Sequence, residues 1–191
     1  MAVRDGMTTI ITDLRAMTNA GTADYSVGGV TYWTDAQIQD IADRHAEDFY
    51  RVQVEPQLEY SGGAVVYKRY YLPIEGDIES GTAFICENVA GSAMGTALYS
   101  LDALRRVVTF TSDTAGVSYF FTGRRVDMNA AASNIWRNKA NYYANKFDFS
   151  SDNHSVKYSQ VAGQCLKMAQ RYGDMSRASG VSAELFRSDS L

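Results

Sequence analysis

The sequence contains few of the residues that disulfide frameworks and metal centres require. Its 191 residues include two cysteines and two histidines. Two cysteines cannot form the disulfide framework of a small secreted domain, so we expect Cys86 and Cys165 to be buried free thiols. His45 and His154 have no Cys or His partner at a ligand spacing, and we therefore expect no zinc or transition-metal site.

Long apolar runs are missing as well. No stretch approaches the roughly 18 consecutive apolar residues of a membrane span, and 46% hydrophobic with 21% charged residues is the composition of an ordinary globular protein. The first 20 residues carry Arg4, Asp5, Asp13 and Arg15 among their apolar positions, unlike the continuous apolar stretch of a secretory signal. We expect a protein that is made in a cytoplasm and has no membrane partner.

Sequence motifs of common enzymes are also missing. Neither the Walker pattern nor the dinucleotide glycine fingerprint occurs, and the segment AGSAMG at 90–95 has its glycines in the wrong register for a serine hydrolase. Glu75, Asp77 and Glu79 are close enough in sequence to flank a glycosidic bond, but the sequence shows no second group that would make one of them an acid. We expect no enzyme, no catalytic residue and no cofactor.

Charge is distributed unevenly along the chain, whose net charge is −4. Residues 1–52 contain four basic and eight acidic side chains, residues 53–127 six and nine, and residues 128–191 eight and five. This gradient lacks the dense Lys/Arg stripe of nucleic-acid-binding proteins. Two interpretations remain open: an ordinary solvated surface, or an assembly in which the acidic face of one copy meets the basic face of the next.

The N-terminal part of the chain shows helical periodicity. An amphipathic helix that stops near residues 19–21 is predicted by Met7, Ile10, Ile11, Leu14 and Met17. The Gly28-Gly29 pair between two short β-prone runs at 25–32 predicts a tight hairpin.

Thr34 and Gln37 form the pattern of a capping box, with Trp33 and Ile38 at the hydrophobic-staple positions. This is the best-specified helix start in the sequence. We expect the helix to continue to about Arg51 because apolar residues keep recurring on one face.

The middle of the chain is rich in Tyr, Val and Gly. Strands are expected at 65–72, 82–86, 97–101, 106–111 and 117–122. Regular turns without helical spacers imply antiparallel pairing in a small sandwich or barrel.

Helical periodicity returns after Val126. Asp127 or Asn129 can cap a helix that continues to about Phe147, and residues 147–154 are expected to form a polar turn. A narrow apolar stripe then marks the last helix, which should pack on its neighbour as an antiparallel helical hairpin; its members are Tyr158, Val161, Cys165, Met168, Tyr172 and Met175.

These patterns predict an α+β fold in which a small helical bundle of about four helices, from the two chain ends, carries an inserted antiparallel β domain. We assign residues 1–53 and 127–178 to the bundle, 54–126 to the insertion and 179–191 to a C-terminal tail. The tail contains an apolar cluster, Glu184-Leu185-Phe186-Arg187.

Aromatic and basic residues of the β region leave several interpretations open. The chain has thirteen tyrosines, and those of the β region fit a plain β core, subunit contacts or carbohydrate contacts. The basic doublets Lys68-Arg69, Arg105-Arg106 and Arg124-Arg125 are spaced too widely for a single-stranded nucleic-acid patch. We expect each doublet to give one solvated charge and one edge or interface charge.

Taken together, several segments resemble the head-tail adaptor, or connector, proteins of tailed bacteriophages. The similarity covers the helical parts, about half the chain, and is carried by the helix starts and packing residues at 33–44 (WTDAQIQDIADR), 126–140 (VDMNAAASNIWRNKA), 147–150 (FDFS) and 164–169 (QCLKMA). In that family a helical bundle forms the wedge of a ring, usually of twelve copies, below the portal.

The resemblance implies a structural virion protein at the neck. Its expected partners are further copies of itself, the portal, a tail-completion or tail tube protein, and packaged DNA that passes through without sequence-specific binding. By analogy, Glu184, Leu185, Phe186 and Arg187 would contact the portal. A subunit or tail interface would use Lys68, Arg69, Tyr70, Arg124 and Arg125. The alternatives are another neck or tail-completion component, or a glycan-binding accessory protein that uses the tyrosine-rich β region.

Overall fold

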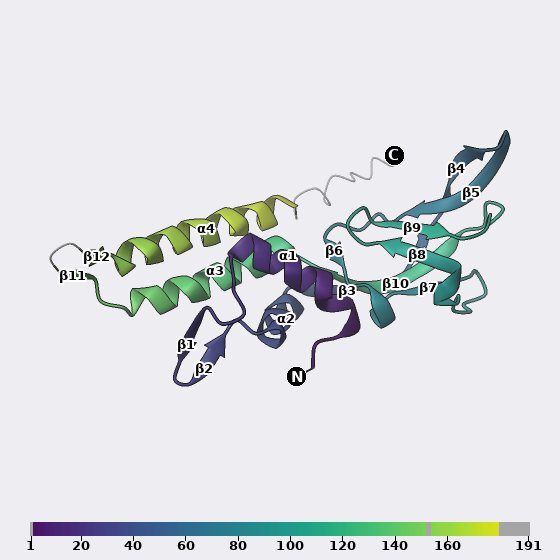
Figure 1. The fold of residues 1–191 in the computed structure, drawn as a ribbon. Helices are drawn as coiled ribbons and strands as arrows, with labels where there is room; N and C mark the ends of the chain where they lie inside the picture. Colours follow the sequence, from purple (N-terminus) through teal and green to yellow (C-terminus); the bar gives the residue numbers. More distant parts are fainter. Residues whose placement is uncertain (1, 152–153, 180–191) are drawn as a thin grey trace, which may run out of the picture. The chain divides into compact units, whose positions relative to one another are not determined.

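A computed structural model describes residues 2–151 and 154–179. The chain divides into two compact units: Met1–Ile11 with Ala46–Val126, and Thr12–His45 with Asp127–Leu191. We call them the β unit and the helical unit. Four α-helices and antiparallel sheets make the α+β class predicted from sequence correct (Figure 1).

The helical unit contains the first helix from Thr12 onward, the predicted hairpin and the other three helices. Helix α1 (Thr8–Thr18) leads into strands β1 (Tyr25–Val27) and β2 (Val30–Tyr32), followed by α2 (Asp35–Arg44). Gly28 and Gly29 have φ angles of 56° and 80°, as the tight turn between these strands requires. The capping box at Thr34 is present in full, which confirms the expected helix start.

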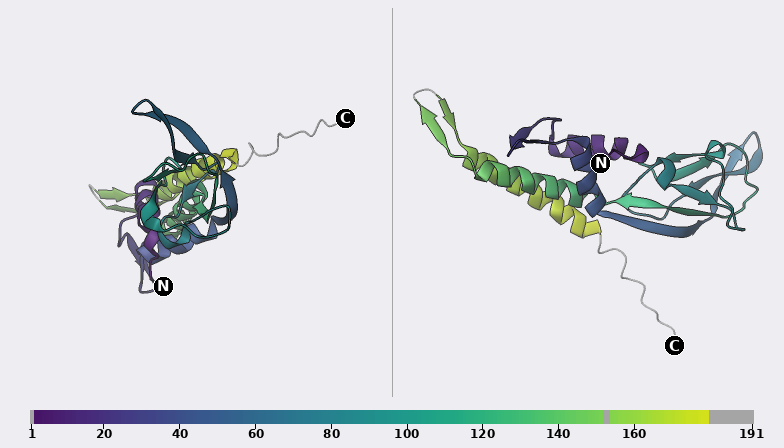
Figure 2. Two further views of the ribbon diagram at one scale, coloured as in Figure 1. Left: turned by 90° about the vertical axis from the view of Figure 1, so that its right-hand side faces the viewer. Right: turned by 90° about the horizontal axis from the view of Figure 1, so that it is seen from below.

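The second half of the helical unit is an antiparallel helix pair. Helices α3 (Met128–Ala144) and α4 (Tyr158–Ser179) lie side by side in every view (Figure 1, Figure 2). The Asp127 carboxylate caps α3 by accepting from the Ala130 amide and also accepts from the Ser176 hydroxyl of α4. Small side chains form the contact on α4, where Ala162, Cys165 and Ala169 are buried.

The end of this pair departs from the prediction. Helix α3 ends at Ala144 instead of near Phe147, and the expected turn contains a short hairpin of β11 (Phe149–Ser151) and β12 (His154–Val156). The predicted apolar stripe on α4 is wrong at its edges, because Val161 and Met175 are exposed. The close packing of small residues displaces the buried face by part of a helical turn.

The β unit consists of two antiparallel four-stranded sheets. In one, β10 (Tyr119–Val126) pairs with β3 (Ala46–Val54), β6 (Asp77–Ile78) and β7 (Ile85–Glu87). The other has the order β4 (Pro56–Ser61), β5 (Ala64–Tyr71), β9 (Val107–Phe110) and β8 (Tyr99–Asp102). One apolar core draws Val54 and Phe121 from the first sheet and Tyr70 and Phe110 from the second. This sharing agrees with the expected small sandwich.

The predicted helix to Arg51 is wrong. Helix α2 ends at Arg44, and residues 46–54 form β3, which pairs with β10 from Ala46↔Val126 to Val54↔Tyr119. The helical unit therefore gives way to the β unit at Ala46, earlier than the predicted boundary at 54, and the first 11 residues also group with the β unit.

Smaller differences concern the other strands. Short 3-10 turns at Gly81–Ala83 and Thr96–Leu98 replace the first residues of two predicted strands. Strand β4 was not predicted, although it forms a long hairpin with β5 whose tip extends beyond the rest of its sheet (Figure 1).

Candidate functional site

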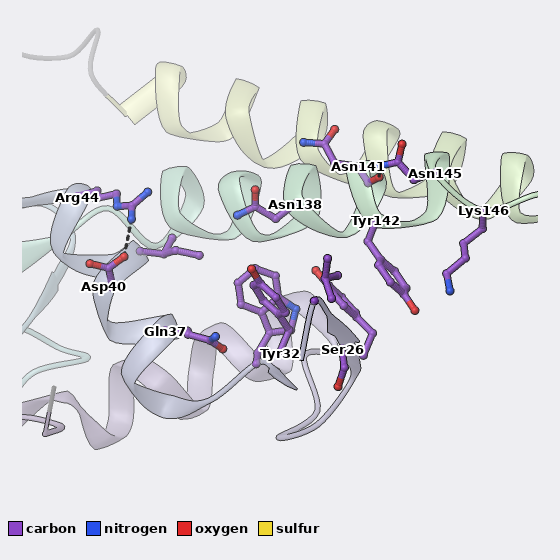
Figure 3. Close-up of a pocket in the computed structure, with 15 residues that line it drawn as sticks. Ser26, Tyr32, Gln37, Asp40, Arg44, Asn138, Asn141, Tyr142, Asn145 and Lys146 are labelled. Atoms are coloured by element: carbon purple, nitrogen blue, oxygen red, sulfur yellow. Dashed lines mark hydrogen bonds and ion pairs between the residues drawn. The ribbon is translucent and has the colours of Figure 1, made fainter. Parts of the chain in front are cut away.

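A concave site lies within the helical unit, between the β1–β2 hairpin, α2 and α3. It is a cavity of about 760 Å³, which is in the size range of ligand pockets. Figure 3 shows its polar side chains, with Gln37, Asp40 and Arg44 on α2 and the asparagines on α3. We call this cavity the amide groove.

Local sequence positions the α2 side of the groove. The Gln37 amide donates to the Thr34 hydroxyl (3.3 Å), and the Gln37 side-chain oxygen accepts from the Thr34 amide (2.9 Å). Arg15 of α1 holds the segment before α2, since its guanidinium donates to the carbonyls of Ala20 (2.7 Å) and Trp33 (2.9 Å). The first turn of α2 is thus fixed from two directions.

An aromatic cluster closes one end of the groove. The Tyr25 ring stacks on Tyr142 of α3 (centroids 3.9 Å apart, 9° between planes) and on Tyr32 (5.1 Å, 21°). Burial, followed by the nearby Tyr32 and Asp24, raises the pKa of Tyr25. Trp33 meets both Tyr25 and Tyr32 edge-on and is only 2% exposed. The cluster anchors the hairpin to α3.

Carboxamides line the α3 side. Asn138, Asn141 and Asn145 follow one another at spacings of three and four residues, which places them on one helical face. The Asn138 side-chain amide donates to Asn134 Oδ1 (3.2 Å), and that of Asn145 donates to the Asn141 carbonyl (2.9 Å). On the opposite side Asp40 and Arg44 form an ion pair. Such a lining offers hydrogen-bond donors and acceptors with little net charge.

The groove contains a buried donor with an unmet hydrogen-bonding capacity. Trp33 lines the groove, and among the described residues its Nε1–H has no hydrogen-bond partner. The second tryptophan, Trp136, donates its indole N–H to the Met17 carbonyl (3.3 Å). Sequence reasoning missed this groove, although the asparagine spacing at 138, 141 and 145 was a visible signal.

The residues predicted for a subunit or tail interface lie in the β unit. Tyr70 is fully buried. Its hydroxyl lies within hydrogen-bonding distance of the Thr114 hydroxyl (2.7 Å) and of the Val117 carbonyl (2.6 Å). Its assignment to an interface is therefore wrong, because an aromatic ring between the two sheets is needed in the core. Lys68 approaches the Thr111 carbonyl (3.4 Å), and Arg69 pairs with Glu59.

The Arg124-Arg125 doublet is paired across strands. Arg124 donates to Asp48 (2.8 Å), and Arg125 pairs with Glu47. The hydrogen bond from Arg124 lowers the pKa of Asp48. Both arginines thus help to hold β10 on β3, and a role in an interface remains a prediction for these two and for Lys68 and Arg69.

The predicted portal-contact residues Glu184, Leu185, Phe186 and Arg187 lie outside the described residues.

The two cysteines are buried and free, as expected, and burial raises the pKa of the Cys86 thiol to about 12. Within residues 2–151 and 154–179, no group of three or more His, Cys, Asp or Glu side chains is arranged to hold a metal ion.

The two acidic residues on either side of β6, Glu75 and Glu79, have different contacts. Glu79 is buried at 1% exposure, and both of its oxygens accept from the Arg4 guanidinium, at 2.7 and 2.9 Å. Glu75 contributes its backbone carbonyl as an acceptor for Arg125 (3.1 Å).

Comparison with known proteins leaves the family open. No protein-family profile matches the chain, and no curated protein sequence matches it significantly. Among the described helices, none combines the length and the apolar character needed to cross a membrane.

Proposed function

We propose that this protein is a structural head-tail adaptor of a tailed bacteriophage. In this role the helical unit forms the wedge of a ring between the portal and the tail, and the ring extends the channel for packaged DNA. The β unit and the C-terminal residues serve as docking surfaces for neighbouring components. The proposal takes its direction from the sequence resemblance described above.

The helical segments that carry the resemblance support it. The capped starts at Thr34 and Asp127 open α2 and α3, and α3 and α4 form the antiparallel pair expected for a wedge. A wedge uses its flanks for contact with the next copy, in a head-to-tail arrangement that closes a ring.

The single observation that carries the proposal is the surface of α4. Its buried face is a narrow stripe of small residues, and large apolar side chains are exposed on both flanks of that stripe: Val161 and Met175 on one, Leu166 on the other. Lys167 and Arg171 lie beside Met175, together with Asp174. We assign these exposed apolar residues to a contact with another molecule.

Charge indicates what that molecule is. Within the helical unit, residues 12–45 contain two basic and five acidic side chains, whereas residues 127–179 contain seven and four. A head-to-tail contact would bring the basic α3–α4 side of one copy to the acidic side of the next, which is the complementarity that orients subunits. A second copy is therefore the partner that we assign to α4.

The β4–β5 hairpin supplies a second docking surface. Leu58 and Tyr60 are exposed on β4, and their cross-strand partners are Tyr67 and Val65. These four side chains occupy one face of the hairpin, because paired residues and every second residue share a face. We assign this face to the tail side of the ring.

The decisive experiment is electron microscopy of the purified chain mixed with the portal protein from the same genome, with light-scattering mass measurement of the chain alone. The proposal expects a ring that caps one end of the portal. A chain that stays monomeric and leaves the portal bare would contradict it. Binding to a carbohydrate array by the monomer would instead favour the glycan-binding alternative.

A matched pair of variants tests the α4 surface. Leu166→Asp places a charge on the proposed contact and should abolish ring formation without loss of helical content by circular dichroism. Leu104→Asp changes a still more exposed leucine of the β unit and should leave the ring intact. Equal effects of both variants would remove α4 from the contact.

A further inference from the structure

We propose that the amide groove binds an extended peptide segment of a partner protein, with the asparagine row of α3 holding the peptide backbone. This inference stands on the groove alone and does not depend on the ring.

The first step concerns hydrogen-bond chemistry. A carboxamide presents a donor and an acceptor side by side and can bind the N–H and C=O of one peptide unit together. Asn141 makes no side-chain hydrogen bond to the described residues, and the side-chain oxygens of Asn138 and Asn145 remain available as acceptors. Gln37, on the α2 side, uses its oxygen in the capping box and leaves its amide N–H₂ for a ligand.

The second step concerns spacing. Asn138 and Asn145 are seven residues apart on α3, a separation of about 10.5 Å along the helix axis. Three residues of extended chain cover about 10 Å. The row therefore matches the length of a short extended segment that lies along α3.

The third step excludes charge as the main recognition element. Asp40 and Arg44 neutralise each other, and the Lys146 ammonium lies over the Tyr142 ring (4.9 Å). A groove of this kind suits a neutral polar ligand, and a peptide backbone is one. Phosphate-rich ligands would require a surplus of basic side chains.

The fourth step separates a peptide from a sugar, the other neutral polar ligand. Sugar rings are held by open aromatic faces, but here Tyr25 is stacked between two rings and Trp33 is buried. What the groove offers instead is a row of amides, whose donors and acceptors suit a peptide unit.

The experiment uses the full chain and a display library of random short peptides, selected on wild-type protein. The best peptide is then synthesised and titrated by calorimetry. The double variant Asn141→Ala/Asn145→Ala should weaken binding by about tenfold or more, since each lost pair of hydrogen bonds contributes to affinity. The matched control Gln164→Ala/Gln170→Ala removes two exposed amides of α4 and should bind like wild type.

Two further readouts tie the binding to the backbone and to the groove. Replacing a central amide of the peptide by an ester should weaken binding to wild type. In a ¹⁵N correlation spectrum the indole signal of Trp33 should move on titration, and that of Trp136, which is bonded to Met17, should stay in place.

Three results would overturn the inference. The first is that no selected peptide depends on the asparagines for binding. The second is that a neutral oligosaccharide such as chitotriose moves the Trp33 signal and peptides do not. The third is that dilution of the protein alone moves the Trp33 signal, which would make a second copy the occupant. Ring formation is measured separately, so failure here leaves the adaptor proposal intact, and failure of the ring leaves this one intact.

Discussion

The ammonium Nζ of Lys139 lies 2.5 Å from Oδ2 of Asp24 and donates to the Asn19 carbonyl at 2.8 Å. Lys139 is 5% exposed, so α3 carries a buried charge whose partners come from the chain between α1 and β1. The pair ties the N-terminal part of the helical unit to α3.

Lys139→Met should destabilise the protein because it leaves the Asp24 carboxylate without its partner. Removal of one member of a fully buried pair costs about 3–5 kcal/mol; Asp24 keeps partial contact with water, so we expect about 1–3 kcal/mol. Urea unfolding followed by tryptophan fluorescence measures it. The control Arg137→Ala, at an exposed position of α3, should change the free energy of unfolding by less than about 0.5 kcal/mol.

Gly6→Ala should destabilise the β unit. A Cβ at Gly6 would lie 1.8 Å from the Ser80 carbonyl oxygen, so the segment must move away and weaken the adjacent pair of Arg4 with Glu79. We expect a loss of about 1–3 kcal/mol, as for other overpacked sites.

Gly163→Ala is the matched control, because a Cβ there meets no atom within 4 Å. In the middle of α4 it should stabilise the protein by about 0.5–1 kcal/mol. Equal unfolding midpoints for the two variants would show that the contact of Gly6 with Ser80 does not matter for stability.

Thr34→Ala should remove the acceptor of the Gln37 amide and cost about 1 kcal/mol. Thr34→Ser keeps the hydroxyl and should recover most of the loss. Differential scanning calorimetry of the three proteins would decide it, and a serine variant no more stable than the alanine variant would contradict a capping role.

Acidification should weaken the fold through His45. Burial lowers the pKa of His45 from its usual 6.5, against the smaller opposing effect of Asp127. The native state thus prefers the neutral ring, whose Nε2 accepts from the Asn134 side-chain amide at 3.3 Å. For a base with a lowered native pKa the unfolded chain binds the proton first, so this contribution is complete above pH 6.5 and is lost as the pH falls below it.

His45→Gln should flatten that part of the profile. Unfolding free energies between pH 7.5 and 5.5 would fall for wild type and change less for the variant, with His154 common to both proteins. A parallel decline of both profiles would exclude His45 as the cause.

Local sequence signals predicted the parts of the fold that local interactions determine. The capping box at Thr34 and the turn at Gly28-Gly29 are each complete within a few residues, and both are present as predicted. Residues 46–54 were different, since Phe49 and Val52 fit a helical face as well as a strand. Pairing with β10, more than 60 residues later, decides their conformation.

The candidate site depends still more on distant contacts. Tyr25 and Tyr142 stack at 3.9 Å although they are far apart in the chain, and nothing near either residue predicts the other. The spacing of the three asparagines is visible in the sequence. That they line one side of the amide groove becomes clear only from the structure, where α2 lies opposite α3. Tyr70 illustrates the reverse error, because an abundance of tyrosine predicts surfaces and cores equally well.

The β unit leaves the helical unit and returns to it through neighbouring strands. Ala46 pairs with Val126, and the Asp127 amide donates to the His45 carbonyl at 2.9 Å. The two ends of the insertion thus lie next to each other. Adjacent ends are the usual condition under which one domain can be inserted into another, or exchanged, without disturbing the host domain. Residues between these two junctions can therefore vary in length or sequence while the junctions themselves stay in place, provided that the contact of Arg4 with Glu79 is kept or replaced.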